Sequence, residues 1–177
     1  MRERLRGLIA ERALSTGQFT LASGTGTGYF FDMKQVMLDP EGLMLIAEAF
    51  LERIRDEPAD HIGGIAMGAV PIVAAVCAFS RATPRPRRAF FVRKETKDHG
   101  TERRVEGYLP EGGEVLLFED VTTTGGSAMI AVEAARAAGC RVETLYTVVD
   151  RLEGAEANLA REGIRLVPLF TRDDFAT

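Results

Sequence analysis

The sequence predicts an α/β fold in which a mostly parallel central sheet is flanked by helices. Segments typical of strands and of helices alternate along the 177 residues, and several strand segments are short, uninterrupted apolar runs. Such runs are typical of strands that helices cover on both faces. The composition, 46% hydrophobic and 27% charged, is that of a globular protein with one core, so we expect a single domain over 1–177.

The first half of the chain is expected to supply three helices and the first strands. We predict a helix over 1–15, a loop with strand-like ends over 19–32, a helix over 39–56, a short strand over 61–67 and a helix over 70–81. The helix at 39–56 has a clear start, because Asp39 is a favourable N-cap and Pro40 is tolerated in the first helical turn.

Strands and helices keep alternating in the second half. We predict a strand near 89–93, an exposed polar loop over 95–107, a buried strand over 114–120, a helix over 127–139, a strand over 142–151, a helix over 154–163 and a final strand over 164–170. Gly139 would cap the helix before it, since glycine readily adopts the left-handed conformation of a C-terminal cap. Sheets of this kind bind ligands at the carboxyl ends of their strands.

The charge of the chain argues against a nucleic-acid partner. It has 22 basic and 26 acidic residues, a formal net charge of −4, so a global basic field is absent. Any bound anion must therefore be held by local charge. One basic cluster has no evident role and is interpreted as solvated surface. It consists of Arg81, Arg85, Arg87 and Arg88.

One apolar segment has to be distinguished from a membrane span. Residues 62–79 carry no charge over 18 positions, which is the lower edge of the length that crosses a bilayer. Gly63, Gly64, Gly68 and Pro71 divide the segment into a strand, a glycine loop and a helix. We therefore assign it to the α/β core and expect no membrane partner.

The start of the chain and its cysteines predict a cytoplasmic location. MRERLRGLIAERAL is too charged for a signal peptide. Cys77 and Cys140 are the only cysteines, and the sequence has neither a CxxC motif nor a Cys/His cluster typical of a metal site. Free thiols in a reducing compartment are expected.

The stretch VLLFEDVTTTGGSAM, residues 115–129, is the most informative part of the sequence. Its apolar run ends at two acids, Glu119 and Asp120, and a turn rich in threonine and glycine then leads into a helix. The N–H groups of the turn and the positive end of the helix dipole suit a phosphate. Gly125 and Gly126 let the backbone approach it closely. Further donors are the hydroxyls of Thr122, Thr123, Thr124 and Ser127.

The two carboxylates would repel a phosphate unless they hold another group. Ribose hydroxyls are suitable partners, because carboxylates accept their hydrogen bonds, and a divalent cation could assist. The lysine that a P-loop requires is absent, and so is a GxGxxG pattern. The stretch therefore indicates a site for a sugar with a 5′-phosphate. The alternative is an ordinary helix N-cap preceded by two solvated acids.

A second set of candidate residues lies in the segment RKETKDHG, which begins at Arg93. Preorganised cations stabilise a departing anion such as diphosphate, and a histidine can also donate a proton. The cationic candidates are Arg93, Lys94, Lys97 and His99. The alternative is a solvated hairpin in which the interleaved acids pair with these bases. Those acids are Glu95, Asp98 and Glu102.

VLLFEDVTTTGGSA resembles the phosphoribosyl pyrophosphate (PRPP) binding motif of type I phosphoribosyltransferases. RKETKDHG is similar to the catalytic loop of the orotate phosphoribosyltransferases among them. The resemblance implies transfer of a phosphoribosyl group from PRPP to orotate, giving orotidine 5′-monophosphate and diphosphate in pyrimidine biosynthesis. It implies the type I phosphoribosyltransferase fold with a hood formed by 1–35 and the C-terminal strand. It also implies Mg²⁺ held mainly by substrate oxygens, and a homodimer in which the 93–104 loop reaches the neighbouring active site.

The resemblance assigns roles to individual residues. Glu119 and Asp120 would hold the ribose hydroxyls. Lys97 and His99 would be catalytic, with Asp98 orienting them. The implied PRPP contacts are Arg93, Lys94, Lys97, His99, Glu119, Asp120, Val121, Thr122, Thr123, Thr124, Gly125, Gly126 and Ser127.

For the base, the resemblance implies contacts from Thr123, Arg151, Phe30 and Phe31. A guanidinium suits a planar carboxylate through bidentate pairing, although without the resemblance Arg151 would be interpreted as a surface ion pair. Residues 18–32 contain FTLASG and GYFFD, which resemble an element that lies against the base. Phe30 and Phe31 either border the pyrimidine or anchor the core.

The sequence departs from the family pattern at two places. Many members have a lysine where this chain has Ala22, and some have Tyr-Lys where it has Met67 and Gly68. Two possible PRPP contacts are therefore missing. Lys34 and the backbone of 67–70 are candidates to compensate.

Two other functions fit parts of the pattern. A phosphoribosyltransferase for another base, such as a purine, is disfavoured by Arg151 and by the RKETKDHG loop. A non-catalytic PRPP-sensing regulator, or a bare nucleotide-binding module, would keep the phosphate-binding turn and lack the catalytic loop, which this chain retains.

Overall fold

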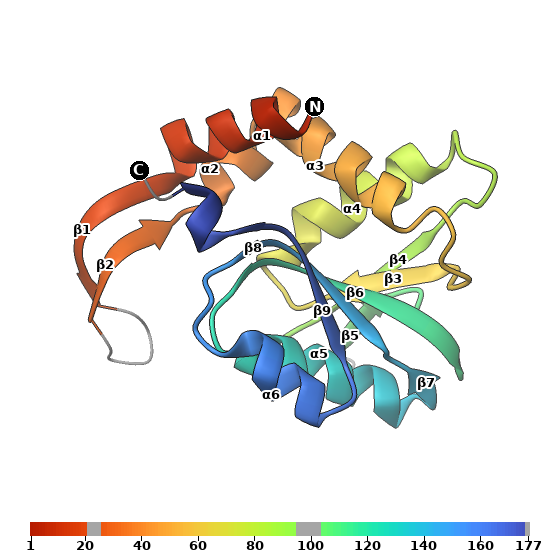
Figure 1. The fold of residues 1–177 in the computed structure, drawn as a ribbon. Helices are drawn as coiled ribbons and strands as arrows, with labels where there is room; N and C mark the ends of the chain where they lie inside the picture. The colour runs from red at the N-terminus through yellow and green to blue at the C-terminus, as the bar shows by residue number, and fades with distance from the viewer. Residues whose placement is uncertain (21–25, 95–103, 176–177) are drawn as a thin grey trace.

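A computed structural model describes residues 1–20, 26–94 and 104–175 of the chain. A twisted central sheet lies between two layers of helices, and a separate two-stranded ribbon lies beside it (Figure 1). This is the α/β architecture that the alternating sequence predicts.

The central sheet is parallel except at one edge. Its strand order is β5 (Val105–Gly107), β4 (Arg88–Val92), β3 (His61–Gly64), β6 (Gly113–Thr122), β8 (Thr144–Asp150) and β9 (Arg165–Thr171), with β7 (Cys140–Arg141) paired to the start of β6. Among the described strands of this sheet, only the β4–β5 pair is antiparallel. Leu116 pairs with Ile62 of β3, and Leu117 pairs with Leu145 of β8, so β6 is the central strand.

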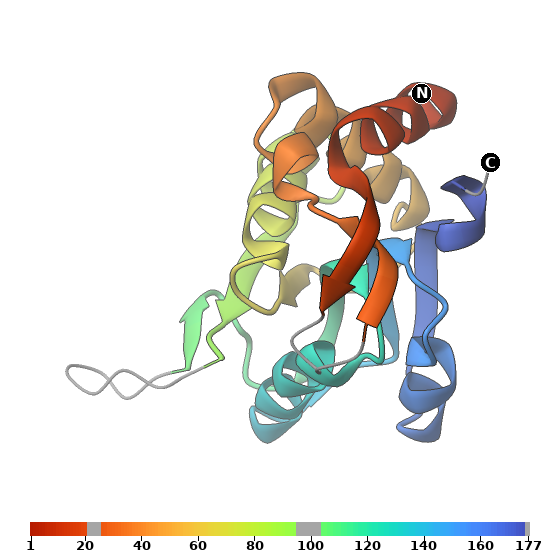
Figure 2. The same ribbon diagram turned by 90° about the vertical axis from the view of Figure 1, so that its left-hand side faces the viewer.

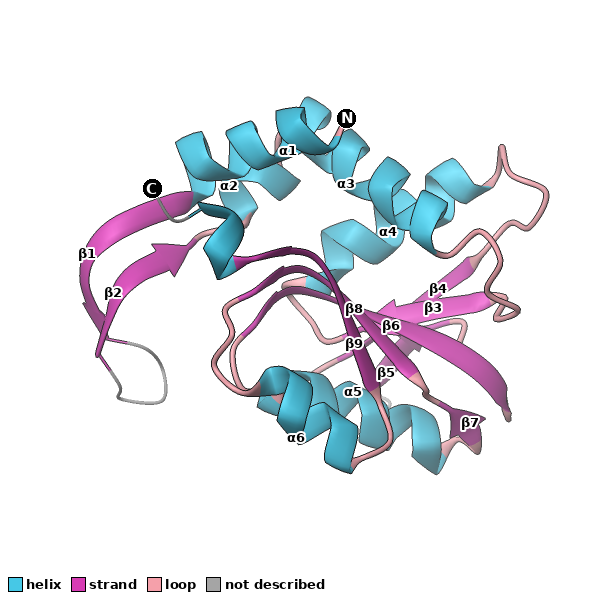
Figure 3. Cartoon of the chain, in the orientation of Figure 1, coloured by secondary structure: helices cyan, strands magenta, loops and turns pink. Residues whose placement is uncertain are grey.

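Helices cover both faces of this sheet (Figure 3). The helices α3 (Pro40–Arg53) and α4 (Ala69–Ser80) lie on one face, and α5 (Gly126–Ala137) and α6 (Ala155–Arg161) lie on the other. Successive residues of β6 point to opposite faces. Phe118 accordingly packs in the α3/α4 core with Phe50 and Tyr146, whereas Leu117 belongs to the α5/α6 core. The chain leaves β3 and β6 toward opposite faces, which makes their carboxyl ends the switch point of the sheet.

The N-terminal segment differs in detail from the predicted helix over 1–15. It contains α1 (Arg2–Leu8), a π-helical turn η1 (Ile9–Ala13), strand β1 (Leu14–Thr20), strand β2 (Gly26–Phe31) and the short helix α2 (Lys34–Met37). The strand begins at Leu14 because β1 and β2 pair as an antiparallel ribbon in which Leu14 lies opposite Phe31. Non-local pairing of this kind overrides local helical preference.

The C-terminal strand β9 and the ribbon belong to different sheets. β9 pairs with β8 in the central sheet, since its apolar residues are needed to complete the two cores. The 3-10 turn that follows, η2 (Arg172–Phe175), is what reaches the ribbon, and Phe175 packs edge-on against Phe31 with ring centroids 5.3 Å apart.

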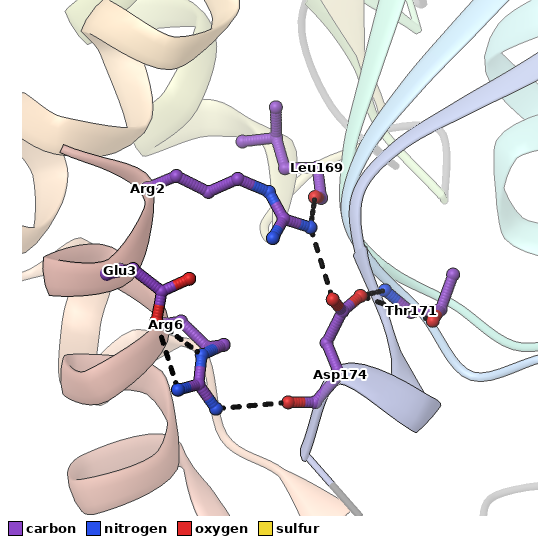
Figure 4. A network of polar contacts seen from close by, with 6 residues as sticks. All are labelled: Arg2, Glu3, Arg6, Leu169, Thr171 and Asp174. Carbon is purple, nitrogen blue, oxygen red and sulfur yellow. Dashed lines mark hydrogen bonds and ion pairs between the residues drawn. The ribbon is translucent and has the colours of Figure 1, made fainter.

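Polar contacts join the two ends of the chain beside this packing (Figure 4). Arg2 donates to the Leu169 carbonyl and pairs with the Asp174 carboxylate, both at 3.2 Å. Arg6 donates to the Asp174 carbonyl at 3.3 Å. Asp174 in turn accepts the Thr171 N–H at 2.8 Å. Helix α1 and the turn η2 are thereby held together.

Two predicted helix caps are confirmed. The Asp39 carboxylate accepts a hydrogen bond from the Gly42 N–H at 3.0 Å, with Pro40 in the first turn of α3. Gly139 follows the end of α5 with φ +79° and donates its N–H to the Arg136 carbonyl at 2.9 Å. The Asp39 and Gly139 signals therefore correctly marked the start of α3 and the end of α5.

The interpretation of the arginine cluster as solvated surface is wrong for Arg87. Its side chain is 4% exposed and donates to the carbonyls of Ile54 and Glu57 at 2.9 and 3.0 Å, which satisfies the end of α3. Arg85 donates to the same Glu57 carbonyl at 3.1 Å. Burial lowers the pKa of Arg87, so the carbonyl contacts offset a cost of desolvation.

Within the described residues, no helix is long and apolar enough to span a bilayer. The apolar segment 62–79 is instead divided between β3 and α4, as its glycines predict.

Candidate active site at the carboxyl edge of the sheet

The predicted site residues that the structure describes gather at one edge of the central sheet. Arg93 and Lys94 follow β4, residues 119–127 span the end of β6 and the turn after it, and Arg151 follows β8, whereas Phe30 and Phe31 lie in the ribbon strand β2. The switch point between β3 and β6 lies in the middle of this edge. It is where an open α/β sheet binds its ligand.

Glu119 and Asp120 lie within β6 and not after its end. The predicted strand ended at 120, but Val121 and Thr122 continue the ladder by pairing with Val149 and Asp150 of β8. The neighbouring strand thus extends the regular structure beyond the apolar run. The consequence is that both carboxylates are held by a rigid central strand.

Glu119 is a buried carboxyl, 7% exposed, and its Oε2 accepts no hydrogen bond from the described residues. Burial raises the pKa of Glu119 well above its ordinary value, and the neighbouring charge of Asp120 raises it further, whereas Lys94 opposes the shift. A buried acceptor without a donor is costly. A ligand hydroxyl at this position would remove that cost.

Asp120 lies against the glycine loop that follows β3. Burial raises its pKa, while a hydrogen bond from the Val121 N–H at 2.9 Å and the charges of Lys34 and Lys94 act in the opposite direction. A Cβ added to Gly68 would overlap the Asp120 carboxylate. The absence of a side chain at 68 therefore leaves room for the acid, and Lys34, which ion-pairs with Asp32, places a positive charge near it.

The turn after β6 has the geometry of an anion site. Thr123 to Gly125 connect β6 to α5, whose first turn points its N–H groups toward the same edge. Gly125 has φ +83°, a conformation in which other residues are strained, so glycine is required here. The Thr123 and Thr124 carbonyls are bound by Ala155 and Asn158 of α6, at 3.1 and 2.9 Å, which fixes the turn from outside.

The four predicted hydroxyl donors are not equivalent. Thr122 is 3% exposed and donates to Asp150 at 3.1 Å, so its hydroxyl joins β6 to β8. Thr124 and Ser127 are exposed and Thr123 is half-buried. The accessible hydroxyls are therefore those of Thr123, Thr124 and Ser127.

The larger of two cavities lies away from this edge of the sheet. A cavity of about 850 Å³ lies between the end of α3 and the segment before β4, and no predicted site residue lines it. A hollow of about 30 Å³ is lined by residues between Glu119 and Ala128. We assign the site to the smaller hollow, because the buried carboxylate and the helix N-terminus converge there.

The basic segment leaves the sheet next to the two acids. At its base the Arg93 N–H donates to the Arg104 carbonyl at 2.8 Å, and Arg104 donates to the Lys94 carbonyl at 2.8 Å, which continues the β4–β5 hairpin. This hairpin projects from the body of the molecule (Figure 2). The strand β5 occupies residues that we predicted to be loop, because its three residues pair with β4 despite their polarity. Lys97, Asp98 and His99 lie outside the described residues.

The residue predicted to bind the base, Arg151, is buried and not a surface ion pair. It is 2% exposed, its Nη2 lies 2.8 Å from the Glu153 carboxylate, and its guanidinium carbon lies 4.7 Å from the centre of the Tyr29 ring. Phe31 is 5% exposed and belongs to the core, as one of the two alternatives states, whereas Phe30 is 38% exposed. A base-bordering role is compatible with Phe30.

Sequence reasoning missed three residues of this edge. Tyr29 and Glu153 contact Arg151 directly, and Asp150 binds the Thr122 hydroxyl and the Leu152 N–H. Glu153 follows Arg151 by two positions at the end of a strand. This spacing allows a turn that brings the two charged side chains together, and it is the signal that could have identified Glu153. Nothing in the periodicity of β2 distinguishes Tyr29 from its phenylalanine neighbours.

The oxygen-rich edge contains no dedicated metal cluster among the residues that the structure describes: no group of three or more His, Cys, Asp or Glu side chains could hold an ion there. Both cysteines are free thiols, Cys140 buried and Cys77 half-buried. For Cys140, burial raises the pKa of the thiol. A buried, protonated thiol is a poor nucleophile, so Cys140 is structural.

No protein-family model matches the chain. The orotate phosphoribosyltransferase of Bradyrhizobium sp. strain BTAi1 is 43% identical to it, over 98% of this chain and 96% of the relative. Two crystal structures of Mycobacterium tuberculosis orotate phosphoribosyltransferase are also similar. The complex with Fe(III) dicitrate matches with a TM-score of 0.85 and 34% identity, covering 99% of both chains. The complex with PRPP matches with a TM-score of 0.80 and 31% identity, covering 98% of both.

Proposed function

The chain belongs to the orotate phosphoribosyltransferase family, and on this premise we propose how its residues transfer the phosphoribosyl group of PRPP to orotate. The products are orotidine 5′-monophosphate and diphosphate, a step of pyrimidine biosynthesis. The observation that carries the residue assignment is the carboxylate pair of Glu119, which is buried, and Asp120, which is half-buried, next to the N-terminus of α5.

In this proposal the sugar phosphate binds across the end of β6. Glu119 and Asp120 accept hydrogen bonds from the ribose hydroxyls, which relieves the burial of an acceptor that has no partner among the described residues. The 5′-phosphate lies in the turn from Val121 to Ser127, where it receives N–H groups of the turn and of the first turn of α5. The accessible hydroxyls of Thr123, Thr124 and Ser127 add donors.

The reaction breaks the bond between the ribose C1 and the diphosphate oxygen and forms a bond from C1 to the orotate ring nitrogen, which gives up its proton to solvent. Diphosphate leaves with the electron pair of the broken bond. Arg93, Lys94 and Lys97 stabilise the charge that develops on the leaving group, and His99 donates a proton to it. Asp98 orients the side chains of Lys97 and His99.

Thr123 and Arg151 position the base on the other side of the ribose. The guanidinium of Arg151 pairs with the orotate carboxylate, and Phe30 borders the pyrimidine ring. Closure of the 93–104 loop over the substrates would exclude water, which is the competing acceptor for the phosphoribosyl group.

Mg²⁺ is the proposed cofactor, and the donors at this edge fit it. The carboxylates of Glu119 and Asp120 are oxygen ligands of the kind that Mg²⁺ prefers, and few protein ligands are needed when substrate oxygens supply the rest. When bound, Mg²⁺ would neutralise charge on the diphosphate.

We further propose a cytoplasmic homodimer in which the 93–104 loop completes the neighbouring active site. The supporting observation is that the β4–β5 hairpin directs the base of this loop away from its own subunit (Figure 2). Mixing Lys97→Ala subunits with Arg151→Gln subunits tests this arrangement. If loops act in the neighbouring site, some mixed dimers regain one intact site and activity returns; two inactive parents that stay inactive on mixing contradict it.

The deciding experiment is a spectrophotometric assay of orotate consumption with PRPP and Mg²⁺. Orotate should disappear, whereas adenine and hypoxanthine should not be used. Lys97→Ala should lower kcat by about 100-fold or more with a modest rise in the KM for PRPP, since general acid–base and electrostatic groups contribute on this order. Unchanged turnover would reject the role of Lys97. Binding of PRPP without consumption of orotate would favour a regulator.

A further inference from the structure

Tyr29, Arg151 and Glu153 form one contact cluster that joins the N-terminal ribbon to the end of β8. The Tyr29 hydroxyl lies 3.1 Å from the Glu153 Oε1 and 3.3 Å from the Arg151 carbonyl, and it has one hydrogen to donate. The same Glu153 oxygen lies 2.8 Å from the Arg151 Nη2. Each member of the cluster therefore contacts the other two.

The cluster restrains the Arg151 guanidinium in two directions. The guanidinium carbon lies over the Tyr29 ring, 4.7 Å from the ring centroid, and the Glu153 carboxylate pairs with Nη2. An arginine side chain has several freely rotating bonds, and fixing it costs conformational entropy. A stacked ring and an ion pair that form during folding remove this cost before a ligand arrives.

The backbone between the two charged residues supports the same interpretation. Leu152 has φ +58°, an uncommon conformation for a residue other than glycine, and its N–H is held by the Asp150 carboxylate at 3.2 Å. This turn brings Glu153 back toward Arg151. Residues held in such conformations are concentrated at functional sites.

We propose that Tyr29 and Glu153 are positioning residues that fix Arg151 for a planar base bearing a carboxylate, and that the preference for such a base depends on them. This inference rests on the proposed role of Arg151 as the group that binds the orotate carboxylate. Tyr29 and Glu153 act through Arg151. Their loss should therefore weaken binding of the base and leave PRPP binding intact.

The competing explanation is that the cluster only fastens the ribbon to the sheet. In that case its loss would lower thermal stability and could weaken binding of any pyrimidine through Phe30 of the same ribbon. A fastening role would not lower the preference for orotate over uracil, because Phe30 would border either ring. The two explanations are distinguished by measuring the preference for orotate over uracil alongside the KM for orotate, the KM for PRPP and the melting temperature of the same variants.

The test uses Tyr29→Phe, Tyr29→Leu and Glu153→Gln. Tyr29→Phe keeps the stacked ring and removes the hydroxyl, which makes it the conservative variant if Tyr29→Leu fails to fold. Tyr108→Phe and Glu162→Gln are matched controls. Tyr108 is 64% exposed and lies over the Arg88 guanidinium. Glu162, at the C-terminal end of α6, pairs with Arg136 in the last turn of α5.

Tyr29→Leu and Glu153→Gln should each raise the KM for orotate about tenfold, which corresponds to a loss of about 1.4 kcal/mol of binding free energy. Tyr29→Phe should raise it about threefold, since the ring remains. The KM for PRPP should change by less than about twofold, and the preference for orotate over uracil should fall in parallel. The double variant should lose less than the product of the single losses, because both act on one guanidinium.

Equal changes in both KM values, or an unchanged preference for orotate over uracil, would overturn the inference. Arg151→Gln is measured alongside, so that the role of Arg151 in binding the base is tested separately from its positioning by Tyr29 and Glu153. If Arg151→Gln abolishes the orotate preference and the Tyr29 and Glu153 variants do not, only the positioning role fails. If Arg151→Gln also leaves the KM for orotate unchanged, the proposed role of Arg151 fails as well.

Discussion

Glu119 is a residue whose burial serves the proposed substrate and opposes folding. Its carboxyl is 7% exposed and lies beside Asp120, and burial followed by the neighbouring charge raises its pKa well above the ordinary value. The folded protein therefore binds the Glu119 proton more tightly than the unfolded chain does. Stability falls as the pH rises from the ordinary glutamate pKa toward the raised one, because the charged form is the costly one.

Replacing Glu119 by glutamine should separate the two effects. Glu119→Gln should increase the free energy of unfolding at pH 8 by roughly 1–3 kcal/mol, the cost of a buried unsatisfied group, with little gain at pH 5. The same variant should have a kcat/KM for PRPP at least about tenfold lower. Thermal unfolding at both pH values and initial rates measure these quantities.

Glu111→Gln is the control for this prediction. Glu111 is an exposed glutamate just before β6, so its replacement should change neither stability nor rate. A Glu119→Gln protein that is less stable than the wild type at pH 8 would show that the folded state favours the ionised carboxylate.

Gly68 illustrates a requirement for the absence of a side chain. A Cβ at 68 would overlap the Asp120 carboxylate, whereas a Cβ at Gly7 of α1 would meet nothing within 4 Å. Gly68→Ala should therefore displace Asp120 and lower kcat/KM for PRPP by about tenfold or more, as expected for a misplaced binding group. Gly7→Ala should leave kcat/KM unchanged and stabilise α1 by up to about 1 kcal/mol. Equal kinetics for the two variants would contradict the proposed contact.

At the scale of single elements, α5 has a left-handed glycine at each end. Gly125 precedes it with φ +83° and Gly139 follows it with φ +79°. Replacing either by alanine strains the backbone similarly, by about 1–2 kcal/mol, and should lower the melting temperature by roughly 2–8 °C. Only Gly125 belongs to the turn that we propose to hold the 5′-phosphate. Gly125→Ala should therefore raise the KM for PRPP by about tenfold, and Gly139→Ala should not.

The pair of variants serves as its own control, because both cap the same helix. Initial rates at varied PRPP give the KM, and thermal unfolding gives the stability. A rise in the KM for PRPP in both variants would show that the integrity of α5, and not the turn at 125, controls phosphate binding.

Some elements of the fold could be predicted from the sequence and others could not. The long strands and helices were predictable because their apolar residues repeat with the right period, and the Asp39 and Gly139 signals located ends of α3 and α5. The elements that the prediction missed, α2, β5 and β7, have two to four residues, too few for a period, and exist through tertiary pairing. The N-terminal helix was predicted too long because β1 gains a partner in β2.

The same division holds for the candidate site. Acids, glycines and hydroxyls that follow one another in sequence could be recognised as a group, because the end of β6 and the turn after it hold them all. Contacts between distant segments could not. Gly68 meets Asp120, and Tyr29 meets Arg151, only because the sheet and the ribbon bring them together. The burial of Arg87 is a further example, since its partners are carbonyls that no sequence pattern marks.

At the scale of the whole molecule, the two ends of the chain are linked to the base side of the site. Arg2 of α1 stacks on Phe170 with 4.6 Å to the ring centre, Phe175 packs against Phe170 and Phe31, and Phe31 packs against Tyr29. The ribbon that holds Tyr29 thus depends on contacts made by the first and last elements.

Asp174 is the polar centre of this linkage (Figure 4), and its removal should loosen it. Its side chain accepts hydrogen bonds from the Thr171 N–H and hydroxyl and pairs with Arg2. Asp174→Ala should lower the free energy of unfolding by about 1–2 kcal/mol, mainly through the unsatisfied Thr171 N–H. The ion pair of Arg2 with Asp174 should contribute only about 0.2–1 kcal/mol of the loss in Arg2→Ala, because that pair is largely exposed, and this part of the loss should disappear in 1 M NaCl.

The stabilisation that Asp174 contributes should depend on pH. Burial would raise the pKa of Asp174, but the hydrogen bonds from Thr171 and the charge of Arg2 outweigh it and leave the pKa below the ordinary aspartate value. The stabilisation is therefore present above the ordinary pKa and is lost as the pH falls through the lowered one. Thermal unfolding of the wild type and Asp174→Ala should converge at acidic pH. Asp173→Ala, one residue away and 64% exposed, should show no such difference at any pH. If Asp173→Ala and Asp174→Ala behave alike, the linkage between the ends of the chain contributes nothing to stability.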